Sequence, residues 1–273
     1  MTRLPARKRF GQHFLVQPAI AERIVGLAQL GADATALEIG PGRGALTQRL
    51  AASCRRLLLV EVDRDLAEEL RTAYAAQPAV EVVTADVLSV DLTALLGAHA
   101  PVTVVANLPY NISTPVLMQL LGAPELFDRL VLMLQREVAE RVCAAPGSKA
   151  YGALSVTVQV VADAHVAVRV PPTAFVPRPR VESAVVVIEP RQPVPLAAAA
   201  RRALRTVVRT AFSRRRKQLV NVIAPLTRDP RALLAELGFD PRERPERLAP
   251  ADFVRLSAAL TARAAATTVA ERS

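Results

Sequence analysis

The sequence predicts an α/β fold with an open, largely parallel sheet, followed by a helical segment. Short apolar runs recur over the first two thirds of the chain, and several end in a glycine, an acid or an asparagine. Such endings are typical of parallel strands whose carboxyl ends face a ligand. Beyond residue 192 the apolar residues follow helical spacing, which predicts helices over 198–212, 216–223, 230–237 and 251–265, with fraying from Ala264. We therefore expect two domains, 1–191 and 192–273.

Composition restricts the class of protein. With 273 residues, 51% hydrophobic and 22% charged, the chain is long enough for a real core and reads as globular. No apolar stretch approaches the roughly 20 residues that span a bilayer, and no signal peptide is apparent. Cys54 and Cys143 match neither a metal-site spacing nor a disulfide framework, and the three histidines do not cluster. A cytoplasmic protein without membrane segment or metal is expected, and nothing suggests an obligate dimer.

The net charge of +10 is unevenly distributed. From Arg191 to the end, 17 Lys and Arg stand against 7 Asp and Glu, whereas the preceding residues hold 18 of each. A GC-rich genome would spread arginine evenly, which the counts contradict. The asymmetry favours a neutral catalytic body joined to a basic module that binds a polyanion, most simply nucleic acid.

A glycine-rich turn follows the predicted strand 36–39. The residues from Glu38 to Gly44 read Glu-x-Gly-x-Gly-x-Gly, not the Gly-x-Gly-x-x-Gly of dinucleotide sites, and a helix is predicted over 45–52. Glycines such as Gly40 and Gly42 let a backbone approach a ligand closely. An acid at Glu38 would repel a pyrophosphate but suits the positive amino-acid end of S-adenosylmethionine, which is the cofactor we expect.

Acids also end the next two predicted strands. Glu61, in the strand 57–63, follows the glycines by about 20 residues, the place of a carboxylate that holds ribose hydroxyls. Asp86, followed by Val87, ends the strand 80–87 and could accept from an adenine amino group. A single terminal acid is more often a helix cap or a solvated charge. An adenosine cofactor with an amino-acid end accounts for the whole series.

The predicted strand 102–106 runs into Asn107-Leu108-Pro109-Tyr110, ahead of a helix at 116–121. An amide and a carbonyl fixed by proline can accept the hydrogens of an exocyclic amine, while an aromatic ring stacks on the base. The tetrapeptide resembles the Asn/Asp-Pro-Pro-Tyr/Phe motif of methyltransferases that modify conjugated amino groups. Alone, an ordinary strand-end turn is equally compatible.

The next segments include one conflict. A strand at 128–135 and a helix at 136–144 are predicted, but 154–162 has β-branched residues that favour strand and a helical spacing that favours helix. We predict helix there and a strand over 166–170. The proline-rich loop 171–181 then leads to a strand at 183–188. Phe175, in this loop, would present a second stacking face or anchor the core.

Two basic segments are candidates for RNA contact. In the N-terminal arm, basic residues precede a glycine and the apolar Phe14 and Leu15, although the arm taken alone favours a solvated tail over a phosphate contact. Near the C-terminal helices, consecutive cations repel one another unless phosphate is near, which favours RNA. The candidates are Arg7, Lys8, Arg9, Arg214, Arg215, Arg216 and Lys217.

Five motifs together resemble the KsgA-type (RsmA) small-subunit (16S) ribosomal RNA adenine N6,N6-dimethyltransferases. They are GQHFL at 11–15, EIGPG at 38–42, NLPYNISTP at 107–115, GSKAYG at 147–152 and FVPRPRVES at 175–183. The resemblance covers about residues 7–260. It implies a class I methyltransferase fold, with a Rossmann-like, seven-stranded mixed sheet and a small helical C-terminal domain.

The resemblance also implies an activity and sites. The family uses S-adenosylmethionine to add two methyls to N6 of each of two adjacent adenosines near the 3′ end of small-subunit RNA, within a pre-30S particle. Relatives often have Asn at the position of His13, so a contact from its side chain is less secure than one from its backbone. By motif, the cofactor contacts would come from His13, Leu15, Gly40, Glu61, Asp86 and Asn107.

Two alternatives stay open. A large-subunit adenine methyltransferase of the macrolide-resistance type shares the fold and chemistry, but that group usually has Ile at the position of Leu108. A non-catalytic ribosome-assembly factor could retain the fold, although the intact motifs at Glu38 and Asn107 argue against lost activity.

Overall fold

A computed structural model of the protein describes residues 7, 10–214 and 217–270. The chain forms two compact units, each assembled from two stretches of sequence. The first unit comprises Met1–Ala139 and Asp163–Pro193, and the second comprises Glu140–Ala162 and Val194–Ser273. No helix in the described ranges is long and apolar enough to cross a membrane.

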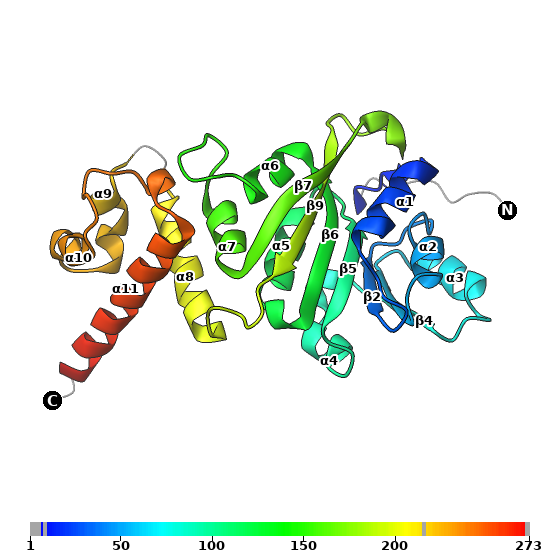
Figure 1. Cartoon of the computed structure of the whole chain (residues 1–273), viewed down its shortest axis with the longest axis horizontal. Helices are drawn as coiled ribbons and strands as arrows, with labels where there is room; N and C mark the ends of the chain where they lie inside the picture. The colour runs from blue at the N-terminus through cyan, green and yellow to red at the C-terminus, as the bar shows by residue number, and fades with distance from the viewer. Residues whose placement is uncertain (1–6, 8–9, 215–216, 271–273) are drawn as a thin grey trace. The chain divides into compact units, whose positions relative to one another are not determined.

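A seven-stranded mixed sheet organises the first unit (Figure 1). Its spatial order is β4 (Val80–Thr84), β3 (Arg56–Glu61), β2 (Thr35–Ile39), β5 (Val102–Asn107), β6 (Phe127–Gln135), β9 (Ser183–Pro190) and β7 (Ala162–Val170). Strands β2 to β6 pair in parallel, and β9 joins β6 antiparallel. The chain moves outward from β2 through β3 to β4 and then returns to β5 on the other side of β2. A switch of this kind opens a crevice at the carboxyl ends of the strands.

The central strands are apolar because they are covered on both faces. In β5, Val104, Val105 and Ala106 are each fully buried. The helices of this unit alternate with the strands, as expected for parallel pairing. They are α1 (Pro18–Leu27), α2 (Thr47–Ala51), α3 (Arg64–Ala73), α4 (Leu92–Leu96), α5 (Ser113–Leu120) and the start of α6 (Arg136–Val142), with 3₁₀ turns η2 (Val87–Ser89), η3 (Pro124–Leu126) and η4 (Pro172–Ala174).

A second, two-stranded sheet ties the N-terminal arm to the proline-rich loop. β1 (Phe14–Leu15) pairs antiparallel with β8 (Phe175–Val176), so that Leu15 lies opposite Phe175. Both of these side chains belong to the buried core of the first unit. The pairing fixes the arm beside the carboxyl ends of the main strands.

The second unit is helical. Tyr151, Phe212 and Phe253 form its aromatic centre, with ring centroids 6.1 and 5.6 Å apart in successive pairs. The Tyr151 hydroxyl donates to the Leu248 carbonyl over 2.9 Å. Its elements are α7 (Ala153–Val161), α8 (Ala198–Ala211), α9 (Leu219–Ile223), η5 (Ala224–Leu226), α10 (Pro230–Glu236), η6 (Pro245–Arg247) and α11 (Pro250–Ala270).

The predicted mixed sheet and C-terminal helices are confirmed, with shifted bounds. Residues 154–161 are helical, as their spacing predicts, and β7 begins at Ala162, four residues before the predicted strand. Helix α2 is shorter than predicted, and α9 begins at Leu219 instead of residue 216. Helix α11 continues to Ala270, five residues beyond the predicted end at residue 265.

Candidate active site

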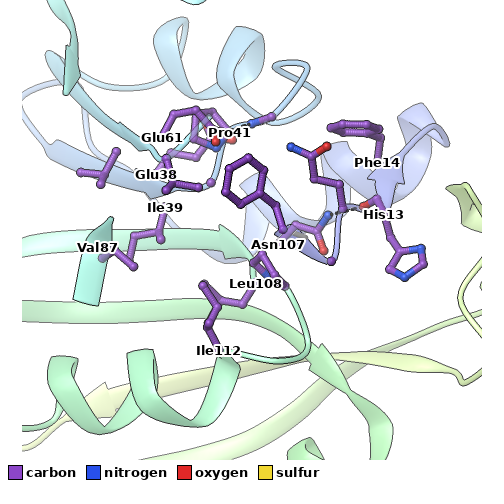
Figure 2. A pocket seen from close by; sticks show the side chains of 18 of the residues that line it. His13, Phe14, Glu38, Ile39, Pro41, Glu61, Val87, Asn107, Leu108 and Ile112 are labelled. Carbon is purple, nitrogen blue, oxygen red and sulfur yellow. Dashed lines mark hydrogen bonds between the residues drawn. The ribbon is translucent and has the colours of Figure 1, made fainter. Parts of the chain in front are cut away.

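A cavity of about 250 Å³ lies at the carboxyl ends of β2, β3, β4 and β5. Its walls come from the N-terminal arm, the glycine turn after β2 and the ends of the following strands (Figure 2). The predicted cofactor residues all line it: His13, Leu15, Glu38, Gly40, Gly42, Glu61, Asp86, Val87 and Asn107. Leu108, Pro109 and Tyr110 line it as well.

The glycine turn approaches the cavity in a conformation that side chains disfavour. Gly40 and Gly42 have φ of +65° and +57°, in the left-handed region. A Cβ on Gly40 would meet no heavy atom within 4 Å, so the space above it can take a ligand. A Cβ on Gly42 would lie 3.1 Å from Cε1 of Phe14. Phe14 of the N-terminal arm thus leaves little room for a side chain at Gly42, whereas the space at Gly40 is open.

Glu38 is the floor of this region. Its side chain is 1% exposed, and Oε2 accepts a hydrogen bond from the Thr47 hydroxyl over 2.7 Å. Burial raises the pKa of Glu38 to about 8, against the Thr47 hydrogen bond and with a smaller contribution from Glu61. A cationic ligand group would favour ionisation of this carboxyl.

Glu61 ends β3 and organises two backbone segments. Its Oε2 accepts from Gly42 N and its Oε1 from Asp63 N, each over 2.9 Å. Burial raises the pKa of Glu61, and the two backbone hydrogen bonds oppose that rise. Each carboxylate oxygen has a further lone pair, so the group can still accept from ligand hydroxyls.

Asp86 and Val87 form another wall. Asp86 is exposed and caps the turn η2, with Leu88 N donating to Oδ1 over 2.9 Å. Val87 is 5% exposed and supplies an apolar surface. Asp86 is therefore a cap, as acids at strand ends often are. Because it also lies at the cavity, it remains a candidate for ligand binding.

Asn107 is held in one orientation by the N-terminal arm. Its Nδ2 donates to the His13 carbonyl over 3.0 Å (Figure 2). Because a carbonyl can only accept, the nitrogen side of the amide must face His13, and Oδ1 is the amide's remaining acceptor. The Pro109 carbonyl accepts from Ile112 N over 3.1 Å, whereas the described structure records no partner for the Leu108 carbonyl. Oδ1 and the Leu108 carbonyl are therefore the two acceptors at this turn.

The His13 side chain turns away from the other labelled side chains in Figure 2. Its Nδ1 lies 2.7 Å from the Pro177 carbonyl, and its ring stacks on Tyr110 with centroids 5.5 Å apart and 28° between planes. The Tyr110 hydroxyl lies 2.7 Å from the Ser183 hydroxyl. His13 thus faces the cavity with its backbone, while its imidazole packs on Tyr110 in the turn that follows β5.

Phe175 does not line the cavity. Its side chain is 1% exposed and packs in the core beside Leu15, its partner across the β1–β8 pair. The ring is therefore not presented to the cavity, and its role as a second stacking face stays a prediction. The alternative of a core anchor describes it instead, because pairing with β1 turns the side chain inward.

Arg7 is paired within the protein. Its Nη1 contacts Asp63 Oδ1 over 2.7 Å, its Nη2 contacts Asp65 Oδ2, and its backbone N donates to Gln12 Oε1. Asp63 is 2% exposed, so this pair is partly shielded from solvent. These ion pairs hold the arm on the start of α3, where Asp63 is the N-cap and Asp65 lies in the first turn. The phosphate contact of Arg7 stays a prediction.

The basic run near α9 is only partly described. Arg214 and Lys217 are exposed in the loop between α8 and α9, where Lys217 N donates to the Arg214 carbonyl. The structure does not bring them to the cavity lining. Lys8, Arg9, Arg215 and Arg216 lie outside the described residues.

Sequence reasoning missed three supporting residues. Thr47 holds Glu38, Ser183 meets Tyr110, and Arg43 lies over the Phe14 ring at 4.1 Å from its centroid. Thr47 follows Glu38 by a single β–turn–helix step, which is a local signal. Ser183 is 73 residues from Tyr110, and no spacing rule connects them. Within the described ranges, no cluster of three or more metal-ligating side chains is found.

Comparisons with known proteins agree with this architecture. Relatives named "Ribosomal RNA small subunit methyltransferase A" include one from Synechococcus sp. (strain JA-3-3Ab), 47% identical over 92% of this chain and 91% of its own. Another, from Geobacter sulfurreducens, is 42% identical over 94% of this chain and 96% of its own.

Two solved structures have similar folds. A dimethyladenosine transferase from Plasmodium falciparum has a TM-score of 0.77 at 25% identity, covering 89% of this chain and 96% of its own. The 23S rRNA methyltransferase ErmE has a TM-score of 0.70 at 26% identity, covering 91% and 99%. The family described as ribosomal RNA adenine dimethylase matches residues 3–262. The chain therefore belongs to the ribosomal RNA adenine dimethylase family.

Proposed function

We propose that this protein transfers methyl groups from S-adenosylmethionine to N6 of two adjacent adenosines near the 3′ end of small-subunit ribosomal RNA. The observation that carries the proposal is the fixed amide of Asn107. Its nitrogen is committed to the His13 carbonyl, and its oxygen remains as an acceptor beside the cavity. The names of the relatives supply the substrate, because they are small-subunit methyltransferases.

The residues at the cavity fit the cofactor. Gly40 leaves open space where a Cβ would lie, and the buried carboxyl of Glu38 suits the ammonium of a methionine moiety. Glu61 would hold the ribose hydroxyls, and Asp86 with Val87 would receive the adenine. When bound, the cofactor supplies an electrophilic methyl group.

The chain's own contribution is to orient the amine. The lone pair of an adenine amino group is conjugated with the ring and is a poor nucleophile. Hydrogen bonds from its two hydrogens to Asn107 Oδ1 and the Leu108 carbonyl would draw the nitrogen toward tetrahedral geometry. Positioning then supplies much of the acceleration. Tyr110 would stack on the flipped-out base.

Proton removal needs no dedicated side chain in this scheme. The methylated amine is strongly acidic and loses its proton to water. For the second methyl, one hydrogen remains to be held, and the first methyl must rotate to expose it. The neutral phenol of Tyr110, whose pKa is raised by burial, acts as a stacking surface and not as a base.

The basic C-terminal segment would bind the RNA. We propose residues 1–191 as the cofactor-binding catalytic domain and 192–273 as an RNA-binding domain, with Arg214 and Lys217 as described contacts. Both side chains are exposed on a loop, where phosphates can reach them. The proposed substrate is the RNA within a pre-30S particle, and the protein acts as a monomer.

The test uses purified protein, labelled S-adenosylmethionine, undermethylated small ribosomal subunits and, in a parallel reaction, large-subunit RNA, with Asn107→Ala as the comparison. Dimethyladenosine near the RNA's 3′ end, lost in the variant, is the expected result. Label confined to large-subunit RNA would move the protein to the resistance-type activity. Binding of subunits without label would favour an assembly factor that lacks catalysis.

A further inference from the structure

Ser183 is a buried polar residue whose side chain has no part in the scheme so far. It opens strand β9, is fully buried, and pairs in the sheet with Gln135 of β6. Its hydroxyl lies 2.7 Å from the Tyr110 hydroxyl, the only side-chain partner that the described structure records for it. A buried hydroxyl is normally satisfied, and here the partner is a candidate base-stacking residue.

The Tyr110 side chain is held at two points and its backbone at a third. Its hydroxyl meets Ser183, the His13 ring covers one face, and its backbone carbonyl accepts from the Ser113 hydroxyl over 3.2 Å. His13 is itself fixed by the Pro177 carbonyl at 2.7 Å. A ring so constrained can rotate little, and only the face opposite His13 remains for a base. Stacking depends on the plane and offset of the two rings, so this restraint sets where the base lies.

We infer that Ser183 is a positioning residue for methyl transfer, which sets the plane of the Tyr110 ring through the contact between their hydroxyls. The inference rests on the proposed function, because it assumes that Tyr110 stacks on the adenine. Ser183 is hydrogen-bonded into the sheet opposite Gln135, and so it fixes the far end of a side chain that begins in a turn. Loss of the contact leaves the ring present but less well oriented, which lowers the rate of transfer more than the affinity for the cofactor.

The experiment compares wild type, Ser183→Ala, Tyr110→Phe and the double variant on undermethylated small subunits. A neutral hydrogen bond contributes about 1 kcal/mol, so each single variant should lower kcat about fivefold. The double variant should be no slower than either single one, because both changes remove the same contact. The dissociation constant for S-adenosylmethionine, measured by calorimetry, should stay within about twofold of wild type.

The control is Ser155→Ala, which removes another fully buried hydroxyl that donates to the Arg141 carbonyl. It should lower thermal stability without lowering kcat. If wild type methylates adenosine and Ser183→Ala keeps full kcat, or if the two single effects multiply in the double variant, the inference is overturned while the proposed function stands. If wild type transfers no methyl to adenosine, the proposed function itself fails.

Discussion

Single side chains at this site serve two purposes, holding the backbone and facing the ligand. Glu61 accepts from the backbone nitrogens of Gly42 and Asp63, so the turn after β2 and the end of β3 are locked by one carboxylate. A carboxylate with only a structural role could accept these two hydrogen bonds far from any cavity. Its place in the cavity lining makes ligand contact and turn geometry inseparable, and a substitution at Glu61 would disturb both.

Glu38 predicts an unusual pH dependence. Its pKa is about 8 when folded against an ordinary value of 4.5. Between these values the folded protein keeps a proton that the unfolded chain has lost. Its contribution to stability is therefore complete below pH 4.5 and declines as the pH rises through 8. In thermal unfolding between pH 5 and 8.5, the melting temperature of wild type should fall as the pH rises. The melting temperature of Glu38→Gln, whose side chain stays neutral, should fall less over the same range.

The control for Glu38 is Glu69→Gln, which changes an exposed carboxyl on α3. This variant should follow the wild-type pH profile. A Glu38→Gln protein that also follows it would contradict the buried, protonated carboxyl. Binding of S-adenosylmethionine should release a proton near pH 7 in wild type and in Glu69→Gln but not in Glu38→Gln, which calorimetry in buffers of different ionisation enthalpy can detect.

At the scale of elements, the turn after β2 depends on glycine at one tight point. Gly42 has φ +57°, and a Cβ there would lie 3.1 Å from Phe14. Gly42→Ala should lower the free energy of unfolding by about 1–2 kcal/mol from the left-handed backbone alone. It should also weaken cofactor binding, because the turn and Phe14 both line the cavity.

Denaturant unfolding and cofactor titration measure both effects of Gly42→Ala. The matched control is Gly26→Ala in α1, where the added Cβ meets nothing within 4 Å. That change should stabilise the protein by about 0.5 kcal/mol, because alanine restricts the unfolded chain. Equal stability of the two variants would argue against a strained turn.

The main sheet could be predicted from sequence because its strands are long, apolar and separated by recognisable turns. The pair β1–β8 could not, since two-residue strands carry no periodicity and join segments about 160 residues apart. The same pairing explains why the sequence left the place of Phe175 open, because only the partner strand β1 shows that this loop residue is turned inward. The ion pairs of Arg7 could not be predicted for a similar reason, because its carboxylate partners lie more than 50 residues away, at the start of α3.

On the scale of the whole molecule, the two units do not follow a single cut in the sequence. Residues 140–162 group with the C-terminal helices, and α7 packs against α8 and α11. A chain ending at Pro193 would leave buried residues of α7, such as Val156 and Val158, without these neighbours. It should bind a hydrophobic dye and unfold at a lower temperature than the full chain. Cooperative unfolding at the full-length temperature, without dye binding, would show that 1–193 folds independently.

The uneven charge predicts a salt dependence for RNA binding. Each phosphate contact contributes about 0.7–0.9 to the slope of log affinity against log salt. Replacing both Arg214 and Lys217 with alanine should reduce the slope for small-subunit RNA by about 1.5 and leave cofactor affinity unchanged. Arg55→Ala, which removes an exposed cation paired with Asp33 in the other unit, serves as the control. Equal slopes for the control and the double variant would place the phosphate contacts elsewhere.

The bond between Asn107 and the His13 carbonyl has a consequence for base selection. Because the nitrogen side of the amide faces the His13 carbonyl, the side chain would meet a bound base as an acceptor, and so would the Leu108 carbonyl. A purine with a carbonyl at C6, as in guanine or hypoxanthine, would bring acceptor against acceptor. Sites that hydrogen-bond a donor discriminate strongly against analogues that lack it. An RNA carrying inosine at the target positions should therefore compete poorly with the adenosine form. The N-terminal arm would then contribute to base selection without contacting the base, because its His13 carbonyl orients the Asn107 amide.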